Sequence, residues 1–225
     1  DGSRRYKNEL PFARGPLELA MRKKVDARAA HGSNLRSARP VAINSMGASA
    51  AIWALKWFAY DAAAQVIGEK PKDFDALVGI SAGFLQRNAK ERFKDIPILF
   101  ISGELDDDTP AAPMKELVTW MAPRGNPHAE IVVLPGEWHD FDGPYAWGYW
   151  PKAGSTSKCQ VEVKPDEQVY ESVETKKTYP LTSAGWGQFR NACATFGVHS
   201  GSLKGQQRLG FDLWTKFLID RLAAQ

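Results

Sequence analysis

PVAINSMG, residues 40–47, is the stretch of sequence that decides the fold of this chain. Its first four residues are a short apolar run of the kind found in strands, and residues 44–47 are typical of a sharp turn. Apolar residues then recur at steps of three and four along residues 48–67, which predicts a helix packed against a large surface. We therefore expect a strand, a tight turn and a long helix in this order.

Strands and helices alternate through most of the remaining chain. Apolar or periodic runs predict strands at 74–80, 96–101 and 130–134, and helices at 17–35, 84–93, 113–122 and 205–223. This alternation predicts an α/β fold with a mostly parallel sheet and helices on both faces. Residues 151–185 are polar and break the rhythm, so we interpret residues 1–225 as a single domain with an insertion there.

Three polar residues follow the ends of predicted strands: Ser45, Asp106 and His139. Functional groups of parallel α/β sheets collect beyond the carboxyl ends of the strands, so we expect these side chains to meet. A serine hydroxyl attacks a carbonyl only when a base removes its proton, and the base needs an acid that fixes its tautomer. Because the order serine, acid, histidine is that of α/β-hydrolases, the sequence predicts a nucleophile, an orienting acid and a general base.

A second serine competes for the role of nucleophile. The hydrolase motif is Gly-x-Ser-x-Gly, and residues 43–47 (INSMG) carry Ile43 at the first glycine, whereas residues 79–83 (GISAG) match it fully. Such folds place a helix, a strand and another helix between the nucleophile and the acid. All three follow Ser45, but only one short predicted helix follows Ser81. This element order favours Ser45 and leaves Ser81 as the alternative.

The sequence alone leaves the acid undecided, but it singles out one histidine. The acid loop holds three consecutive aspartates, at positions 106, 107 and 108, and their residue type alone does not choose among them. His139 has less competition, because the other histidines lie away from the carboxyl end of any predicted strand. They are His31, His128 and His199.

GELDDDTP at 103–110 and LPGEWHDFD at 134–142 resemble the acid and histidine loops of dienelactone hydrolases. In that family a proline lies four residues after the acid, which selects Asp106. SMGAS at 45–49 is similar to the elbow of the family's serine-bearing branch. The resemblance implies an α/β-hydrolase that cleaves a carboxylic ester or lactone through an acyl-enzyme, with the backbone N–H of Met46 in the oxyanion hole.

The resemblance also implies strands that the sequence does not supply. Family members have about four strands before the helix expected at 17–35, and the loop after one of them gives the second oxyanion-hole donor. Too few residues precede residue 40 for these strands. We therefore expect the chain to form the C-terminal part of an α/β-hydrolase sheet that lacks its N-terminal strands. A missing N-terminal segment or a partner chain would complete it.

Aromatic residues crowd the loop that follows the expected general base. They are Trp138, Phe141, Tyr145, Trp147, Tyr149 and Trp150. Ordinary packing would account for them, and so would a wall that binds an apolar or aromatic acyl group. We take Trp138, Phe141, Tyr145 and Trp147 as the candidate substrate-binding residues.

The two cysteines, Cys159 and Cys193, are too few for a disulfide-rich scaffold and have the wrong spacing for a zinc ribbon. Their residue type and spacing leave two buried thiols or one bridge equally open. The tail NACATFG at 191–197 resembles a C-terminal segment of exported relatives. That resemblance implies a Cys159–Cys193 disulfide and a periplasmic or secreted protein, with a cytoplasmic one as the alternative.

The composition excludes several other classes of function. Lys and Arg number 29 against 26 Asp and Glu, a net charge of +3, and no basic run is interleaved with aromatic residues, which argues against nucleic-acid binding. Lys56 and Asp61 interrupt the best apolar stretch, which argues against a membrane span. No group of residues has metal-ligand spacing, and we expect no metal and no cofactor. The competing class is a non-catalytic hydrolase-like binding or scaffold protein, favoured by Ile43 and the missing strands.

Overall fold

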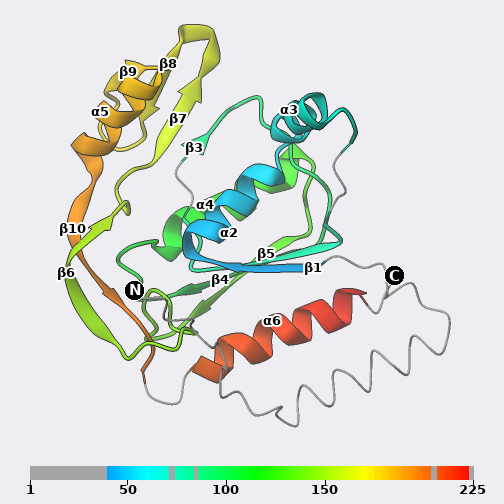
Figure 1. Cartoon of the computed structure of the whole chain (residues 1–225), viewed down its shortest axis with the longest axis vertical. Coiled ribbons are helices and arrows are strands. Elements are labelled where there is room, and N and C mark those ends of the chain that lie inside the picture. The colour runs from blue at the N-terminus through cyan, green and yellow to red at the C-terminus, as the bar shows by residue number, and fades with distance from the viewer. Residues whose placement is uncertain (1–39, 71–73, 84–85, 204–206, 223–225) are drawn as a thin grey trace, which may run out of the picture.

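A parallel four-stranded sheet forms the centre of the molecule (Figure 1). The computed structural model describes residues 40–70, 74–83, 86–203 and 207–222. Within them the sheet has the order β1-β2-β4-β5, and every neighbouring pair in it is parallel. The strands are β1 (Pro40–Asn44), β2 (Ala76–Ile80), β4 (Ile98–Gly103) and β5 (Ala129–Leu134). Their carboxyl ends therefore meet at one edge.

Helices cover both faces of this sheet. Figure 1 shows α2 (Ser45–Ala54) and α4 (Ala111–Met121) on one face and α6 (Gln207–Leu222) on the other. Side chains of β2 and β4 are completely buried beneath both layers, because a parallel strand between two helical layers has no face toward water. The predicted mixed α/β fold with a mostly parallel sheet is confirmed.

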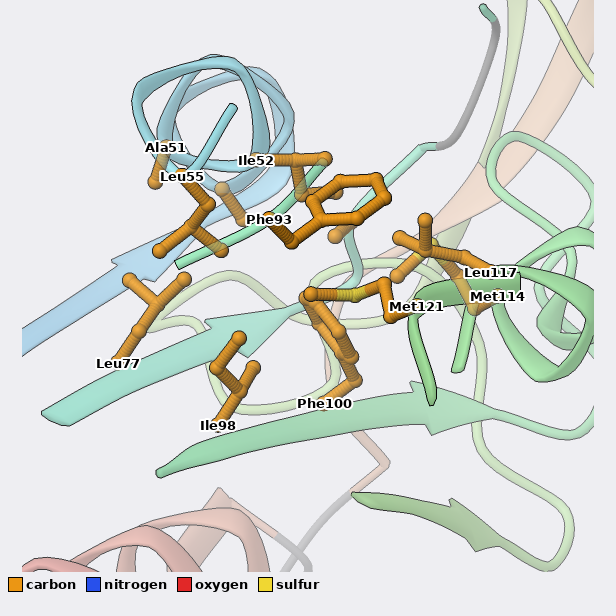
Figure 2. Close-up of a cluster of buried hydrophobic side chains, with 12 residues drawn as sticks. Ala51, Ile52, Leu55, Leu77, Phe93, Ile98, Phe100, Met114, Leu117 and Met121 are labelled. Carbon is orange, nitrogen blue, oxygen red and sulfur yellow. The ribbon is translucent and has the colours of Figure 1, made fainter. Parts of the chain in front are cut away.

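The larger core lies between the sheet and the helices α2 and α4. Figure 2 shows Ile52 of α2 and Leu55, which directly follows α2, facing Leu77 of β2 and Phe100 of β4, with Phe93 lying between Ile52 and the side chains of α4. Methionine and leucine side chains of α4 fill the far end of the same cluster. The other core joins β2, β4 and α6. The larger cluster fixes α2, and with it the turn at its start, over the sheet.

The single helix predicted over 48–67 is wrong, because two helices occupy this range. After α2, Leu55 and Lys56 leave the helical path, and α3 (Trp57–Ile67) begins from an extended Lys56. The Lys56 ammonium is buried and pairs with the carboxylate of Glu91. A charge taken out of water needs such a partner, so the chain bends here to bring the two groups together.

The helix predicted at 84–93 is also wrong. Residues 86–87 form the short strand β3 (Gln86–Arg87), and the segment that follows is irregular. Glu91 bonds to Lys56, and the Lys94 amide donates to the carbonyl of Leu55, so this segment is held by the break after α2. The helix predicted at 17–35 lies outside the described residues.

The region after residue 147 forms an antiparallel excursion beside the parallel sheet. Strands β6 (Gly148–Ser155) and β10 (Thr195–Ser200) pair as a ribbon, which Figure 1 shows running up one side of the molecule. The ribbon carries a small sheet in which β3 pairs with three further strands and which α5 (Ser183–Cys193) covers. Those strands are β7 (Val161–Lys164), β8 (Val169–Ser172) and β9 (Thr178–Pro180).

The predicted disulfide between Cys159 and Cys193 is confirmed. It joins the segment before β7 to the end of α5, and it lies in a small core with Val161, Tyr179 and Phe189. The bridge closes a separation of 34 residues and so limits the freedom of the unfolded insertion. In the described part of the chain, no helix is long and apolar enough to cross a membrane.

Strand β1 has one neighbour, β2, among the described residues. The further strands that the resemblance implies, from a missing N-terminal segment or a partner chain, stay a prediction. Val41 and Ile43 of β1 pack on the larger core, while Pro40 and Ala42 are exposed.

Ile43, the departure from the hydrolase motif, packs directly against Gly47. A Cβ atom at residue 47 would lie 2.4 Å from Cγ2 of Ile43. Because a β-branched side chain has little freedom to move, the glycine at 47 is what makes room for isoleucine at 43. The tight strand-to-helix turn thus tolerates the substitution.

Gly47→Ala should lower the free energy of unfolding, although alanine is normally the better helix former by about 1 kcal/mol. The control is Gly187→Ala in α5, where a Cβ would meet nothing within 4 Å and should stabilise or do nothing. Urea unfolding followed by circular dichroism measures both. An equal or higher stability for Gly47→Ala would contradict this account of the turn.

Candidate active site

Ser45 lies at the junction of β1 and α2, with a backbone φ of 49°. A non-glycine residue rarely adopts this left-handed conformation. The Ser45 Oγ lies 2.9 Å from the Nε2 of His139. A strained serine at a strand-to-helix turn, in contact with an imidazole, is the arrangement in which a base can activate the hydroxyl.

His139 lies in the loop after β5, and its other ring nitrogen faces the loop after β4. Nδ1 is 2.9 Å from Oδ2 of Asp106, whose carboxylate is buried. Oδ1 of Asp106 accepts hydrogen bonds from the backbone N–H groups of Asp108, at 3.0 Å, and Thr109, at 2.7 Å. The structure thus brings Ser45, His139 and Asp106 into one hydrogen-bonded row, from the ends of three parallel strands.

Met46 is the second residue of α2, and its side chain is 84% exposed. The first N–H groups of a helix have no acceptor within the helix, and the positive end of the helix dipole favours an anion there. The Met46 N–H can therefore face the developing oxyanion of a carbonyl attacked by Ser45. We identify no second donor among the described residues.

The charges around His139 favour its protonated form. Burial lowers its pKa, but the hydrogen bond and charge of Asp106 and the charges of Asp140 and Asp108 outweigh burial, and the pKa rises from 6.5 to about 9. One oxygen each of Asp108 and Asp140 lies 3.6 Å from Nε2. Burial in turn raises the pKa of Asp108 and of Asp142. The imidazole is therefore a strong base set among carboxylates.

The three consecutive aspartates that the sequence left undecided have three different partners. Asp106 contacts the imidazole of His139. Asp107 binds His199 of β10 twice, at 2.8 Å through the backbone N–H and at 2.8 Å through Nδ1. Asp108 lines a small hollow beneath the insertion, together with residues such as Thr156. The geometry favours Asp106 as the acid and shows that Asp107 ties the ribbon to the acid loop.

Sequence reasoning set His199 aside, yet it lies at the centre of the aromatic group. Its ring is 4.4 Å from that of Trp138, 5.7 Å from that of Trp147, to which it lies nearly parallel, and 4.9 Å from that of Tyr149. The pairing of Thr195–Ser200 with residues 148–155 creates this cluster, so the order of residues alone gave no signal of it. Tyr145 is 66% exposed near the same end of the ribbon.

Phe141 does not belong with these aromatic residues, and its assignment to substrate binding is wrong. Its side chain is fully buried in the core beneath α6, where its ring lies 2.7 Å from the position of a Cβ at Gly210. The glycine in α6 lets the helix approach the ring. Phe141 therefore anchors the histidine loop to the core.

Ser81, the alternative nucleophile, is fully buried. Its Oγ accepts a hydrogen bond from the backbone N–H of Asp140, and none of its described contacts is to a side chain that could act as a base. Geometry therefore favours Ser45 over Ser81. Among the described residues, no group of three or more His, Cys, Asp and Glu side chains is arranged to hold a metal ion.

Comparison of the chain with protein-family models, with curated proteins and with solved structures finds no match. The chemistry of the site therefore has to be argued from its own geometry.

The pKa of His139 predicts that kcat/KM of any reaction in which His139 acts as the base rises with pH and levels off only near pH 9, because the base must be neutral. The raised pKa also stabilises the folded state. This contribution is full below pH 6.5 and is lost as the pH rises through about 9. The pH profile of kcat/KM tests the first expectation. NMR titration of the His139 ring measures the pKa from which the second expectation follows. His128→Gln, at an exposed histidine, is the control. A plateau already reached at pH 7 would contradict the charge arrangement.

Proposed function

We propose that this protein is a serine hydrolase with an α/β-hydrolase fold that cleaves a carboxylic ester or lactone through an acyl-enzyme intermediate. The observation that carries the proposal is the unbroken row Ser45 Oγ, His139 Nε2, His139 Nδ1 and Asp106 Oδ2, in which both contacts between residues are 2.9 Å long. The acid and the base are buried, which shields the row from water.

The chemical steps follow from these positions. In its neutral form His139 takes the proton of Ser45 as the hydroxyl attacks the substrate carbonyl, and Asp106 stabilises the imidazolium that forms. The N–H of Met46 donates to the oxyanion of the tetrahedral intermediate. The proton passes from Nε2 to the leaving alcohol, which departs and leaves an ester on Ser45. Water activated by His139 then releases the acid in the same way.

The fold supports the same proposal. Nucleophile, acid and base follow β1, β4 and β5 in the order in which α/β-hydrolases carry them. The left-handed backbone at Ser45 is the strain expected of the nucleophile turn. The Trp138, Trp147 and Tyr149 cluster adjoins the histidine loop and is the candidate wall for the acyl group. The disulfide favours an oxidising compartment, so we propose a periplasmic or secreted protein.

A non-catalytic binding or scaffold protein is the second candidate. Two observations favour it: isoleucine at the first glycine of the motif, and the single oxyanion donor found among the described residues. Loss of one such donor typically costs about 100- to 1000-fold in rate. Against it, Gly47 makes room for Ile43, and the Ser45–His139 contact is intact.

Ser45→Ala should reduce hydrolysis of a short activated ester to the background rate in buffer, because the acyl-enzyme can no longer form. Ser81→Ala is the comparison, because it changes the alternative nucleophile, which has the same unusual backbone conformation. It should lower the rate without abolishing it, since its Oγ bonds to the N–H of Asp140 and not to the base. Initial rates with a chromogenic ester measure both. Activity that survives Ser45→Ala, or a loss confined to Ser81→Ala, would overturn the proposal.

A further inference from the structure

Residues 79–83, GISAG, match the nucleophile motif fully, although Ser81 does not contact the base. Ser81 follows β2, the strand between the one that carries Ser45 and the one that precedes Asp106. It is fully buried and has a φ of 47°. A non-glycine residue keeps such a conformation only where its surroundings hold it there. The contacts of Ser81 therefore show which parts of the structure this strained backbone connects.

The polar groups of Ser81 connect two loops of the candidate site. Its N–H donates to the carbonyl of Ile101 in β4, at 2.8 Å, and continues the sheet. Its carbonyl then accepts from the Thr109 hydroxyl in the acid loop, at 2.9 Å. Its Oγ accepts from the N–H of Asp140 in the histidine loop, at 3.3 Å. The left-handed backbone turns the carbonyl and the hydroxyl toward both loops at once.

Thr109 carries this connection to the catalytic row. Its Oγ1 lies 2.9 Å from Oδ2 of Asp106 and 3.0 Å from Nδ1 of His139, which are themselves 2.9 Å apart. A hydroxyl has one proton and two lone pairs, while the carboxylate and the Ser81 carbonyl only accept. The hydroxyl therefore donates to one of these acceptors and presents lone-pair density toward Nδ1–H.

The glycines of the segment serve close packing. A Cβ at Gly79 would lie 2.9 Å from the Phe100 ring, and one at Gly83 would lie 3.1 Å from Cγ2 of Thr109. The Gly83 N–H also donates to Oγ of Ser49, which in turn donates to the carbonyl of Ser45. Residues 79–83 therefore reach the nucleophile turn, the acid loop and the histidine loop.

Backbone strain is concentrated in the same place. Five non-glycine residues among those the structure describes have a positive φ: Ser45, Ser81, Asp140, Gln168 and Lys176. Three of the five belong to the network that residues 79–83 hold together. Strain at functional positions persists when neighbouring contacts over-determine the geometry, and these hydrogen bonds supply such contacts.

We propose that residues 79–83 and Thr109 form a positioning clamp, which holds the Asp106–His139 pair in place relative to Ser45. The Thr109 hydroxyl is the group that touches the pair, and Ser81 is the anchor behind it. The inference rests on the proposed hydrolase function for its kinetic consequence. The clamp itself is a matter of geometry and can be tested without turnover.

Thr109→Val removes the hydroxyl and keeps the shape of the side chain and the Thr109 N–H bond to Asp106. We expect kcat to fall roughly 10- to 100-fold, the range for a hydrogen bond to a charged group, while KM changes less than about twofold. Thr109→Ser restores the hydroxyl and should recover most of kcat. Thr119→Val, at an exposed threonine of α4, is the matched control and should leave kcat unchanged.

The NMR signal of the His139 Nδ1–H proton reports on the Thr109 contact without any substrate. It should shift or broaden in Thr109→Val and return in Thr109→Ser, while thermal unfolding stays close to that of the wild type. Thr109→Ala, which adds no bulk, replaces the valine variant if that variant does not fold. Wild-type kcat in Thr109→Val, or an equal loss in Thr109→Ser, would overturn the clamp. If Ser45-dependent hydrolysis is absent altogether, the proposed function fails, and an unchanged Nδ1–H signal in Thr109→Val would then overturn the clamp as well.

Discussion

The hydrogen bond between Ser45 and His139 joins two residues that are 94 positions apart. It forms because four parallel strands end at one edge of the sheet, so that the turn after β1 and the loop after β5 face each other across β2 and β4. The other contacts of the site depend on the register in which these four strands pair. A shift of one strand by a single residue would turn its side chains to the opposite face and separate the row.

Polar contacts hold the loops beyond this edge, and charged residues of the same loops raise the pKa of His139. Carboxylates of Asp106, Asp108 and Asp140 surround one imidazole, and together they keep its pKa near 9 despite burial. The same acid loop binds the β6–β10 ribbon through Asp107 and His199. The insertion is therefore tied to the candidate site at the acid loop, beside Asp106.

The sequence predicted those features that depend on local periodicity. Alternating apolar runs located the central strands, and the order of Ser45, Asp106 and His139 along them singled out the candidate residues. Features that depend on residues far apart in the chain could not be predicted from the sequence. The pairing of Lys56 with a carboxylate 35 positions away broke a helix whose apolar period was continuous. Burial of Phe141 was decided by α6, far along the chain, and not by the aromatic residues beside it.

Covalent labelling with a fluorophosphonate, followed by intact mass and peptide mapping, tests the central claim most directly, because only a hydroxyl activated by a base reacts readily with this probe. The account predicts one adduct per chain, located on Ser45. Labelling should become faster as the pH rises toward 9, since neutral His139 is the base. An unlabelled folded protein, or an adduct on Ser81 or elsewhere, would contradict the assignment of Ser45 as an activated nucleophile.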